Sequence, residues 1–481
     1  MDFRPVIFVI GLMVAALGLT MFAPMVVDYA YNDRSWQTFG ISGIITTLLG
    51  AVMAMSTYTP KPDLRARGAF LLTAASWVAL SAVAAIPFLM KPMGMSITDA
   101  FFEATSGITT TGSTVLTGLD DLPKGVLLWR AILQWIGGVG IIVTAMAVLP
   151  MLKIGGMQLF RLESSDMGEK ILPRAASIAA AIGMIYLVLT ISCAIGYMIV
   201  GMNAFDAVAH AMTTVATGGY STSDASMGGF SDGGADLVCI AFMMAGAMPF
   251  GVYMLMARGN LQAPFKDSQV RVFIAVMTVL ITVVTCGLWL NTDLPGGQAL
   301  RLSAFNTVSI VTGTGFATTD YNAWGQFAVA AFFVFMFIGG CAGSTACSIK
   351  IFRYQVAFEA LRAYLFKMPK QNAVAPMRYG GKPLPQQVVN SVLGYFFLFF
   401  MTFAFVAIVL SIMGLDPITA WSGAGSADAN VGPGLGDIIG PAGTYQDLPG
   451  GAKWVLMLGM IVGRLEIITA LVLLTPSFWR H

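Results

Sequence analysis

The sequence predicts an all-α polytopic membrane protein. Four fused repeats of helix, pore helix, filter loop and helix surround a pseudo-four-fold pore, and two extra transmembrane helices precede them. Of the 481 residues, 57% are hydrophobic and only 10% are charged, whereas an ordinary soluble domain has about 25% charged residues. Apolar runs of about 20 residues, long enough to cross a bilayer, recur along the whole chain. Four weakly apolar segments that are too short to cross alternate with these runs.

The apolar runs predict ten spanning helices, of which the eighth is interrupted. In chain order they lie near 5–27, 38–57, 69–90, 125–149, 178–200, 235–257, 271–290, 325–362, 388–413 and 452–475. The first run is too long for a cleaved signal peptide, so we expect it to remain as a transmembrane helix. We expect the chain to divide into a two-helix extension (1–57) and repeats 1 to 4 (58–177, 178–258, 259–387 and 388–481).

The basic residues gather on one side of the predicted membrane. Connections on that side hold 19 of the 26 Lys and Arg residues, and the positive-inside rule makes it the cytoplasmic side. Both termini then lie in the cytoplasm. The outer segments carry six basic and sixteen acidic residues, and an acidic mouth concentrates cations. Ordinary charge asymmetry explains the basic side, but it does not require an acidic outer side.

The four short segments align without gaps, and each ends on a glycine. They are 99–112, 206–219, 302–315 and 419–432. Each has about 10–12 weakly apolar residues and then an elbow rich in Thr, Gly or Asn, which is typical of a re-entrant half-helix followed by a non-helical loop. A single elbow would favour simple helix packing by small residues. Four elbows at matched positions favour a shared function.

The elbows predict a cation filter. Backbone outside a helix is tolerated at membrane depth only where it lines a cavity or binds something. Four elbows around one axis would form a ring of carbonyls that replaces the hydration shell of a small cation. The negative end of each half-helix dipole would face the same cation. The terminal glycines would allow the unusual backbone angles that aim carbonyls inward.

Six motifs in the elbows, the interrupted helix and the last predicted span carry a family resemblance. They are TTTGST (109–114), TGGYST (217–222), TGTGFATTDY (312–321), NVGPGLG (430–436), GGCAGST (339–345) and GRLEIITALVLLTP (463–476). With these motifs, the chain resembles over nearly its whole length the membrane subunit of Trk-type potassium transporters, in the Trk/Ktr/HKT superfamily. The two N-terminal helices suit the Trk branch better than the Ktr branch.

The resemblance implies potassium uptake across the bacterial inner membrane, with K⁺ as the transported ion and no cofactor in this chain. It also implies a homodimer and a cytoplasmic nucleotide-binding regulatory subunit of the RCK type, similar to TrkA. By the same resemblance, the residues expected to form the potassium-binding filter are Thr110, Thr111 and Gly112; Thr217, Gly218 and Gly219; Gly313, Thr314 and Gly315; and Asn430, Val431 and Gly432. Because the four elbows differ from one another, we expect weak discrimination among potassium, rubidium and sodium.

An interrupted helix predicts a gate. Phe327–Ile338 is apolar, Gly339–Ser348 is a run of mostly small residues, and helical character resumes at Ile349. Broken helices at membrane depth usually line a pathway and move; the alternative is a packing groove for a neighbouring helix. The family is usually glycine-rich after GGCAGST, whereas this chain departs from it with Ala346, Cys347 and Ser348. The expected gate residues are Gly339, Gly340, Cys341, Ala342, Gly343, Ser344, Thr345 and Arg464.

We assign Arg464 to the predicted gate because it is the only basic residue placed deep within a predicted span. Such an arginine costs roughly 2.5–3.5 kcal/mol on insertion scales, so it should face a pore or a partner. Glu466 is two residues further on and points about 200° away around the helix. We expect Arg464 to bond the carbonyls of Gly339–Ser348 and to hold this loop across the pathway. The alternative is a packing anchor between helices.

Three further polar residues lie on the half-helices or elbows. Asp428 either adds negative potential near the filter or is a hydrogen-bonded loop carboxylate. Glu103 and His210 are expected to pack or to form hydrogen bonds rather than to bind an ion, because a single imidazole matches no metal pattern.

The sequence excludes most other classes. It has no phosphate-binding loop, no dinucleotide fingerprint and no nucleophile–base pattern, so an enzyme is not expected. A net charge of +2 gives no reason to expect a nucleic-acid partner. The main alternative is a sodium- or proton-coupled secondary transporter that works by alternating access. That class predicts inverted repeats and titrating carboxylates in the membrane, whereas these repeats share one orientation and only Glu466 lies deep in a span.

Overall fold

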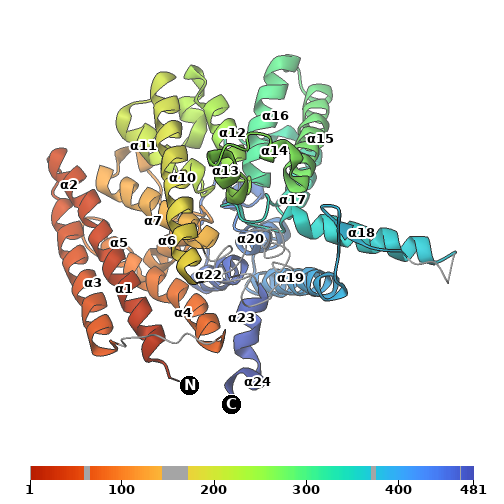
Figure 1. Cartoon of the computed structure of the whole chain (residues 1–481). Helices are drawn as coiled ribbons and strands as arrows, with labels where there is room; N and C mark the ends of the chain where they lie inside the picture. Colours follow the sequence, from red (N-terminus) through yellow and green to blue (C-terminus); the bar gives the residue numbers. More distant parts are fainter. Residues whose placement is uncertain (1, 59–65, 144–171, 370–374, 466, 481) are drawn as a thin grey trace.

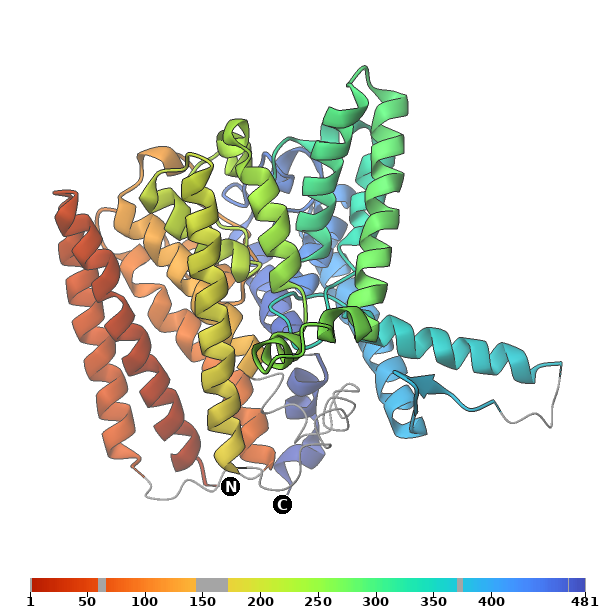
Figure 2. The ribbon, with the colours of Figure 1, turned by 45° about the horizontal axis from the view of Figure 1, so that its top comes forward.

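The regular structure is almost entirely helical (Figure 1). The computed structural model describes residues 2–58, 66–143, 172–369, 375–465 and 467–480. The two-helix extension consists of α1 (Arg4–Thr20) with α2 (Phe22–Ala30) and α3 (Trp36–Ser56). These helices pack closely because glycines face the opposite backbone: a Cβ added to Gly50 would lie closer than 3.0 Å to the backbone of Gly11 and Ala15. The extension lies at one edge of the body (Figures 1 and 2).

Four units of helix, half-helix, elbow and helix follow. Repeat 1 has α4 (Ala66–Ala84), α5 (Ile86–Leu89), α6 (Ile97–Ile108), η1 (Leu119–Asp121) and α7 (Lys124–Val143). Repeat 2 has α10 (Leu172–Ile199), α11 (Ala204–Val215), η3 (Ser226–Gly233), α12 (Ala235–Gly246) and α13 (Phe250–Ala257).

The third and fourth repeats have the same order with additions. Repeat 3 has α14 (Ala263–Lys266), α15 (Ser268–Asn291), α16 (Gly296–Val311), η4 (Tyr321–Trp324), α17 (Gln326–Phe335), α18 (Ile351–Lys367) and the hairpin β1 (Arg378–Tyr379) and β2 (Lys382–Pro383). Repeat 4 has α19 (Gln386–Ile412), α20 (Pro417–Ala429), α21 (Gly436–Ile439), α22 (Gly450–Arg464), α23 (Ile467–Leu474) and α24 (Pro476–Trp479).

The half-helices α6, α11, α16 and α20 begin at defined signals. Ser96, Asn203 and Asp416 each accept a hydrogen bond from a backbone N–H in the first turn of α6, α11 and α20, which is the usual N-cap arrangement. Helix α16 instead starts directly after Pro295. These caps set where each half-helix starts, and so where each elbow begins.

Seven of the ten predicted spans correspond to single spans, of which the first joins α1 with α2 and the third joins α4 with α5. Within the described ranges, seven helices are long and apolar enough to cross a membrane, or eight if the bent pair α12–α13 counts as one. The prediction of one continuous helix over 235–257 was wrong, because the chain bends by 91° between Gly246 and Phe250. Pro249 lies at this bend, and a proline inside a helix removes a hydrogen bond and clashes with the preceding turn.

The other two predicted spans are also broken. In the eighth span, α17 ends at Phe335, and helix returns at Ile351 rather than at Ile349. There α18 projects from the body instead of continuing the span (Figures 1 and 2). In the tenth span α22 ends at Arg464 and α23 begins at Ile467, while Glu466 lies outside the described residues.

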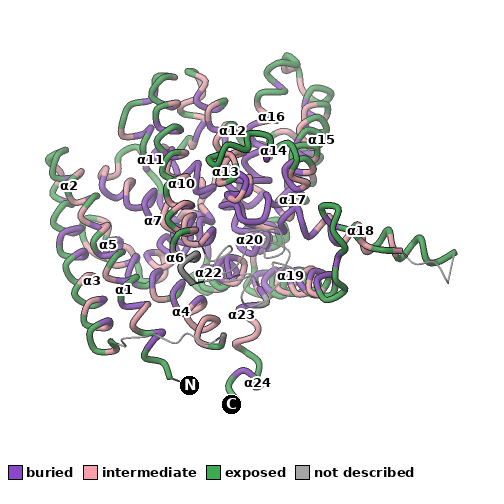
Figure 3. Tube along the Cα trace, viewed as in Figure 1, coloured by how far each residue is buried: buried purple, intermediate pink, exposed green. Residues whose placement is uncertain are grey.

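Buried residues gather where the four repeats meet, and the outward sides of the peripheral helices are exposed (Figure 3). The exposed positions include large apolar side chains such as Leu48, Val279 and Phe397. Apolar side chains on the outside of long helices fit a lipid environment. The two chain ends lie near each other at one end of the body (Figure 2).

Candidate cation filter and gate

The four elbows adopt the same backbone pattern. We name three positions in each elbow. The first positions are Thr110, Thr217, Gly313 and Asn430, with φ of 53°, 50°, 70° and 51°. The third positions are Gly112, Gly219, Gly315 and Gly432, with φ of 90°, 80°, 83° and 111°. Positive φ is uncommon for residues other than glycine, so its recurrence at matched first positions shows that the elbows are conformational equivalents. None of the four middle residues has positive φ, and alternation of this kind orients successive peptide groups in the same direction.

The elbows close into a ring. A Cβ added to any third-position glycine would lie closer than 3.0 Å to the middle-position carbonyl oxygen of the next elbow in chain order. The four pairs are Gly112 with Gly218, Gly219 with Thr314, Gly315 with Val431, and Gly432 with Thr111. Repeats 1, 2, 3 and 4 therefore follow one another around an axis, and the fourth returns to the first.

Most of the ring carbonyls have no protein partner. Among the described residues, no donor bonds the backbone oxygens of Thr110, Thr111, Thr217, Thr314 or Val431, and all five residues are buried. Buried backbone carbonyls are usually paired, so a cluster of unpaired ones indicates a place where something else supplies the positive charge. Oxygen ligands suit hard cations.

The predicted ligands are not all equivalent. The Gly218 carbonyl accepts a hydrogen bond of 2.6 Å from Gln134 Nε2. The Gly432 carbonyl accepts bonds from the hydroxyls of Ser113, Ser426 and Tyr445, at 2.7, 2.9 and 2.8 Å. These two carbonyls are therefore held by the wall of the ring.

A buried ion pair supports the first two elbows. Arg130 Nε lies 2.8 Å from Glu103 Oε1, and both side chains are almost fully buried. Arg130 also donates to the Ser221 carbonyl at 2.9 Å and lies over the ring of Tyr220 at 4.0 Å. His210 contacts Ser221 Oγ through Nε2 at 3.0 Å. Glu103 and His210 thus form hydrogen bonds in the wall, as the sequence predicted.

Asp428 faces a helix rather than the ring. Its side chain is buried, and neither carboxylate oxygen has a hydrogen-bond partner among the described residues. One of these oxygens is 2.9 Å from the position that a Cβ on Gly459 of α22 would take. The alternative of a hydrogen-bonded loop carboxylate is therefore not seen.

The loop 339–350 forms backbone hydrogen bonds with the break between α12 and α13. Backbone N–H groups of Cys341 and Thr345 donate to the carbonyls of Ala247 and Gly246, at 2.9 and 3.1 Å. In return, Phe250 N–H donates to the Gly343 carbonyl at 2.9 Å. All the predicted gate residues from Gly339 to Thr345 are buried. The sequence analysis missed the α12–α13 half of this arrangement, although Pro249 inside an apolar run was the available signal.

Arg464 contacts this loop. Its guanidinium is buried, and Nη1 donates to the sulfur of Cys347. Nη2 donates to the Gly137 carbonyl of α7 at 3.0 Å. The expected acceptor was a loop carbonyl; the acceptor on the loop is instead a thiol, and the carbonyl comes from α7.

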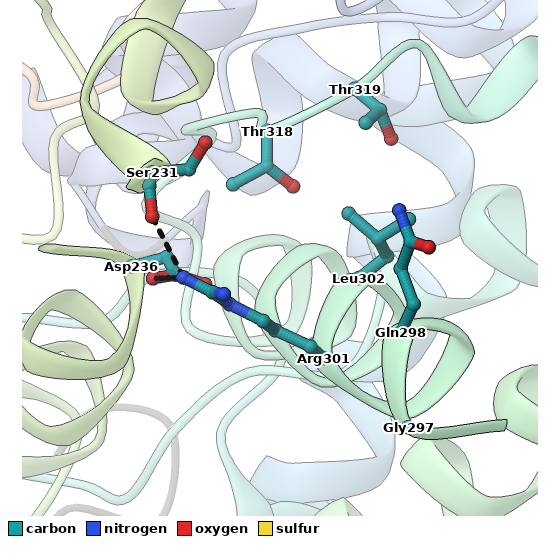
Figure 4. Close-up of a pocket in the computed structure, with 8 residues that line it drawn as sticks. All are labelled: Ser231, Asp236, Gly297, Gln298, Arg301, Leu302, Thr318 and Thr319. Carbon is teal, nitrogen blue, oxygen red and sulfur yellow. Dashed lines mark hydrogen bonds and ion pairs between the residues drawn. The ribbon is translucent and has the colours of Figure 1, made fainter. Parts of the chain in front are cut away.

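A separate pocket of about 610 Å³ lies between repeats 2 and 3. Arg301 of α16 spans it: Nε lies 2.6 Å from Asp236 Oδ2, and Nη2 lies 2.7 Å from the Ser231 carbonyl (Figure 4). Thr318 and Thr319, which follow the third elbow, line the same pocket. The sequence analysis did not single out Arg301, whose bonds connect repeat 3 to repeat 2.

A helical membrane body with four equivalent elbows closed into a ring of backbone oxygens defines a cation-conducting membrane protein. A family model described as "TrkH: Cation transport protein" matches residues 35–480. The chain therefore belongs to the TrkH family of cation transport proteins, which are transporters and not enzymes.

Relatives support this assignment over the full length. The chain is 43% identical to the Trk system potassium uptake protein TrkI of Halomonas elongata, across 99% of this chain and 97% of that protein. It is 35% identical to the Trk system potassium uptake protein TrkH of Escherichia coli, with both chains fully covered. The structure is also similar to the crystal structure of the potassium transporter TrkH from Vibrio parahaemolyticus. The two chains are 37% identical, the TM-score is 0.92, and the match covers the full length of both. These similarities confirm the family resemblance and the predicted fold class.

Proposed function

We propose that this protein takes up potassium across the inner membrane of a bacterium, through the ring formed by the four elbows. The observation that carries the proposal is the closed ring of buried carbonyls, most of which have no hydrogen-bond donor among the described residues. The names of the relatives, which are potassium uptake proteins, support it. The filter residues are those expected from the sequence, and their mixed chemistry supports weak selectivity.

Rubidium uptake into proteoliposomes of the purified protein tests this function. Uptake should be driven by a rubidium gradient alone and should be competed by potassium. Uptake that requires a proton or sodium gradient would instead support the alternative, a coupled secondary transporter. Absence of rubidium uptake under all three conditions contradicts the proposal.

The same pathway carries a gate, formed by Gly339–Ser348 and held by Arg464. Support comes from the burial of the loop beside the first elbow and from the contact between Arg464 and Cys347. The guanidinium holds the loop in the closed position, and its positive charge repels an entering cation. The alternative is that Arg464 only anchors α22 to α7 through Gly137.

Replacement of Arg464 separates these two roles. Arg464→Ala should raise rubidium uptake measured without any partner subunit and normalised to folded protein. Arg464→Lys should give a smaller rise, because an ammonium lacks the planar fork of donors. Arg34→Ala, an exposed arginine in the loop between α2 and α3, is the matched control. Uptake at or below wild type in Arg464→Ala favours the anchor.

Opening of the gate is controlled by a cytoplasmic nucleotide-binding subunit of the RCK type. The chain has no nucleotide-binding motif of its own, and basic residues concentrate on the side predicted to be cytoplasmic, where both termini are also proposed to lie. The chain ends lie at the same end of the body (Figure 2), which supports this orientation.

The functional unit is a homodimer in which α18 packs against a second copy. Helix α18 projects from the body and exposes Phe358, Leu361 and Leu365. It also exposes the charged side chain of Arg362, and neither lipid nor water alone solvates such a mixture well. Sedimentation of the purified protein in detergent measures the mass and tests the dimer.

A further inference from the structure

Cys347 lies near the first positions of two elbows. Its sulfur is 3.9 Å from the hydroxyl of Thr110, the first position of elbow 1. Its backbone nitrogen and Cβ lie 3.6 and 3.8 Å from the place that a Cβ on Gly313 would take, at the first position of elbow 3. Because the elbows follow one another in chain order, elbows 1 and 3 are opposite. A residue that reaches the first positions of both lies across the pathway at that end of the ring.

The loop holds Cys347 tightly. A Cβ on Gly339 would lie closer than 3.0 Å to the Cys347 carbonyl. The next residue, Ser348, has φ of 61°, and its hydroxyl bonds the Met336 carbonyl at 2.7 Å. The backbone therefore fixes where the side chain starts, and the side chain is only 7% exposed. The contact from Arg464 Nη1 fixes where the sulfur lies.

We propose that the Cys347 side chain is the plug that closes the ring and that the bond from Arg464 to its sulfur is the latch. The proposal rests on the gate described above and names the residue through which Arg464 acts. A thiol is a weak acceptor, so the latch is weak enough to be released by a partner subunit. Removal of the sulfur frees Arg464 from the loop and opens the axis at the same time.

Substitution of Cys347 gives a direct test in partner-free rubidium uptake. Cys347→Ala should raise uptake several-fold, as far as Arg464→Ala does. The double variant should be no more active than either single variant, because both remove the same contact. Cys347→Ser keeps an acceptor and should give an intermediate value. Cys193→Ala is the matched control, since Cys193 is a buried cysteine of α10 and lies outside the gate loop.

Silver ion provides a second measurement that does not depend on the folding of the alanine variant. Ag⁺ is a monovalent, thiophilic cation that should follow the transported ion to the sulfur. There it replaces the thiol proton, which passes to water. Low micromolar silver should block the wild type and the Cys193→Ser variant, whereas Cys347→Ser should resist it at least tenfold better. Cys286 is exposed and is present in all three proteins, so silver bound there affects their uptake equally.

The outcomes separate this inference from the gate itself. If Arg464→Ala raises uptake while Cys347→Ala equals wild type, the gate stands and the latch runs through another acceptor. Equal silver block of the wild type and Cys347→Ser shows that the sulfur is not on the pathway, and it also overturns the plug. If Arg464→Ala leaves uptake unchanged but Cys347→Ser resists silver, the sulfur is on the axis and the proposed latch is wrong.

Discussion

At the scale of single residues, the ring depends on glycines that have no room for a side chain. Each third-position glycine combines positive φ with a neighbouring carbonyl closer than 3.0 Å to its missing Cβ. Left-handed backbone alone costs a residue with a side chain about 1 kcal/mol or more. The collision adds to this cost, because the obstacle is the backbone of the next elbow.

The first prediction follows for Gly219→Ser and Gly315→Ser. Each substitution pushes a Cβ against a middle-position carbonyl, Thr314 or Val431, and so shifts an oxygen of the filter. We expect the preference for potassium over sodium to fall at least several-fold, or uptake to be lost. Rubidium uptake in competition with each ion measures this.

Gly183→Ser is the matched control for these substitutions. Gly183 lies within α10, has ordinary φ and has nothing within 4 Å of an added Cβ. It should transport like the wild type. Unchanged ion preference in both filter variants would show that the ring tolerates the displacement and that selectivity arises elsewhere.

The sequence predicted individual site residues unevenly. Alignment of the elbows identified the four glycines, because the constraint on them repeats along the chain. Arg464 was identified by the cost of burying its charge. Its acceptor Cys347 was not, because the choice between a thiol and a carbonyl depends on side-chain packing across repeats. The unequal roles of Gly218 and Gly432 likewise depend on distant partners, such as Gln134 and Tyr445.

At the scale of elements, two broken helices pair the backbone groups that each break leaves free. The break after α12 frees the carbonyls of Gly246 and Ala247, and the break after α17 supplies the N–H groups that bond them. The sequence revealed the second break because ten consecutive small residues interrupt it. It did not reveal the first, because one proline in a strongly apolar run only weakly marks a sharp bend. The gate loop therefore rests on a bent helix of the preceding repeat.

The second prediction concerns the other support of this loop. Gln269, at the start of α15, is buried, and its Oε1 accepts a bond of 2.9 Å from Ala342 N–H. Gln269→Leu keeps the volume but leaves that N–H unpaired, which costs about 1–3 kcal/mol. The loop should loosen, and partner-free rubidium uptake should rise.

Gln386→Leu, at the exposed start of α19, is the control for the loss of a glutamine and should behave as wild type. Uptake of Gln269→Leu equal to that of the control, with the same folded yield, would mean that the loop is held closed without this bond.

At the scale of the whole molecule, polar contacts between repeats close the ring. Arg130 of repeat 1 bonds repeat 2 at Ser221, and Arg301 of repeat 3 bonds repeat 2 at Asp236. Asn430 of repeat 4 donates to Thr111 of repeat 1 at 2.8 Å. The fold class could be predicted because apolar runs and repeated elbows are local in the sequence. The order of the repeats around the axis could not be predicted, since it rests on contacts between distant residues, such as Asn430 and Thr111, which are 319 positions apart.

The last prediction concerns the regulatory partner. Lys367, Arg378 and Lys382 are exposed at the end of α18 and on its hairpin, and Lys370, outside the described residues, lies between them in the chain. Replacement of all four with glutamine removes four positive charges from the proposed cytoplasmic surface. Co-purification with a nucleotide-binding subunit should weaken and become more sensitive to salt, because surface charges act mainly through screened, long-range attraction. The matched control replaces Arg34, between α2 and α3, and Lys91, between α5 and α6; both are exposed, and this variant should retain the partner. Partner-free rubidium uptake should be the same in all three proteins, because none of these residues touches the ring or the loop. Undiminished co-purification of the fourfold variant at physiological salt would place the docking surface elsewhere.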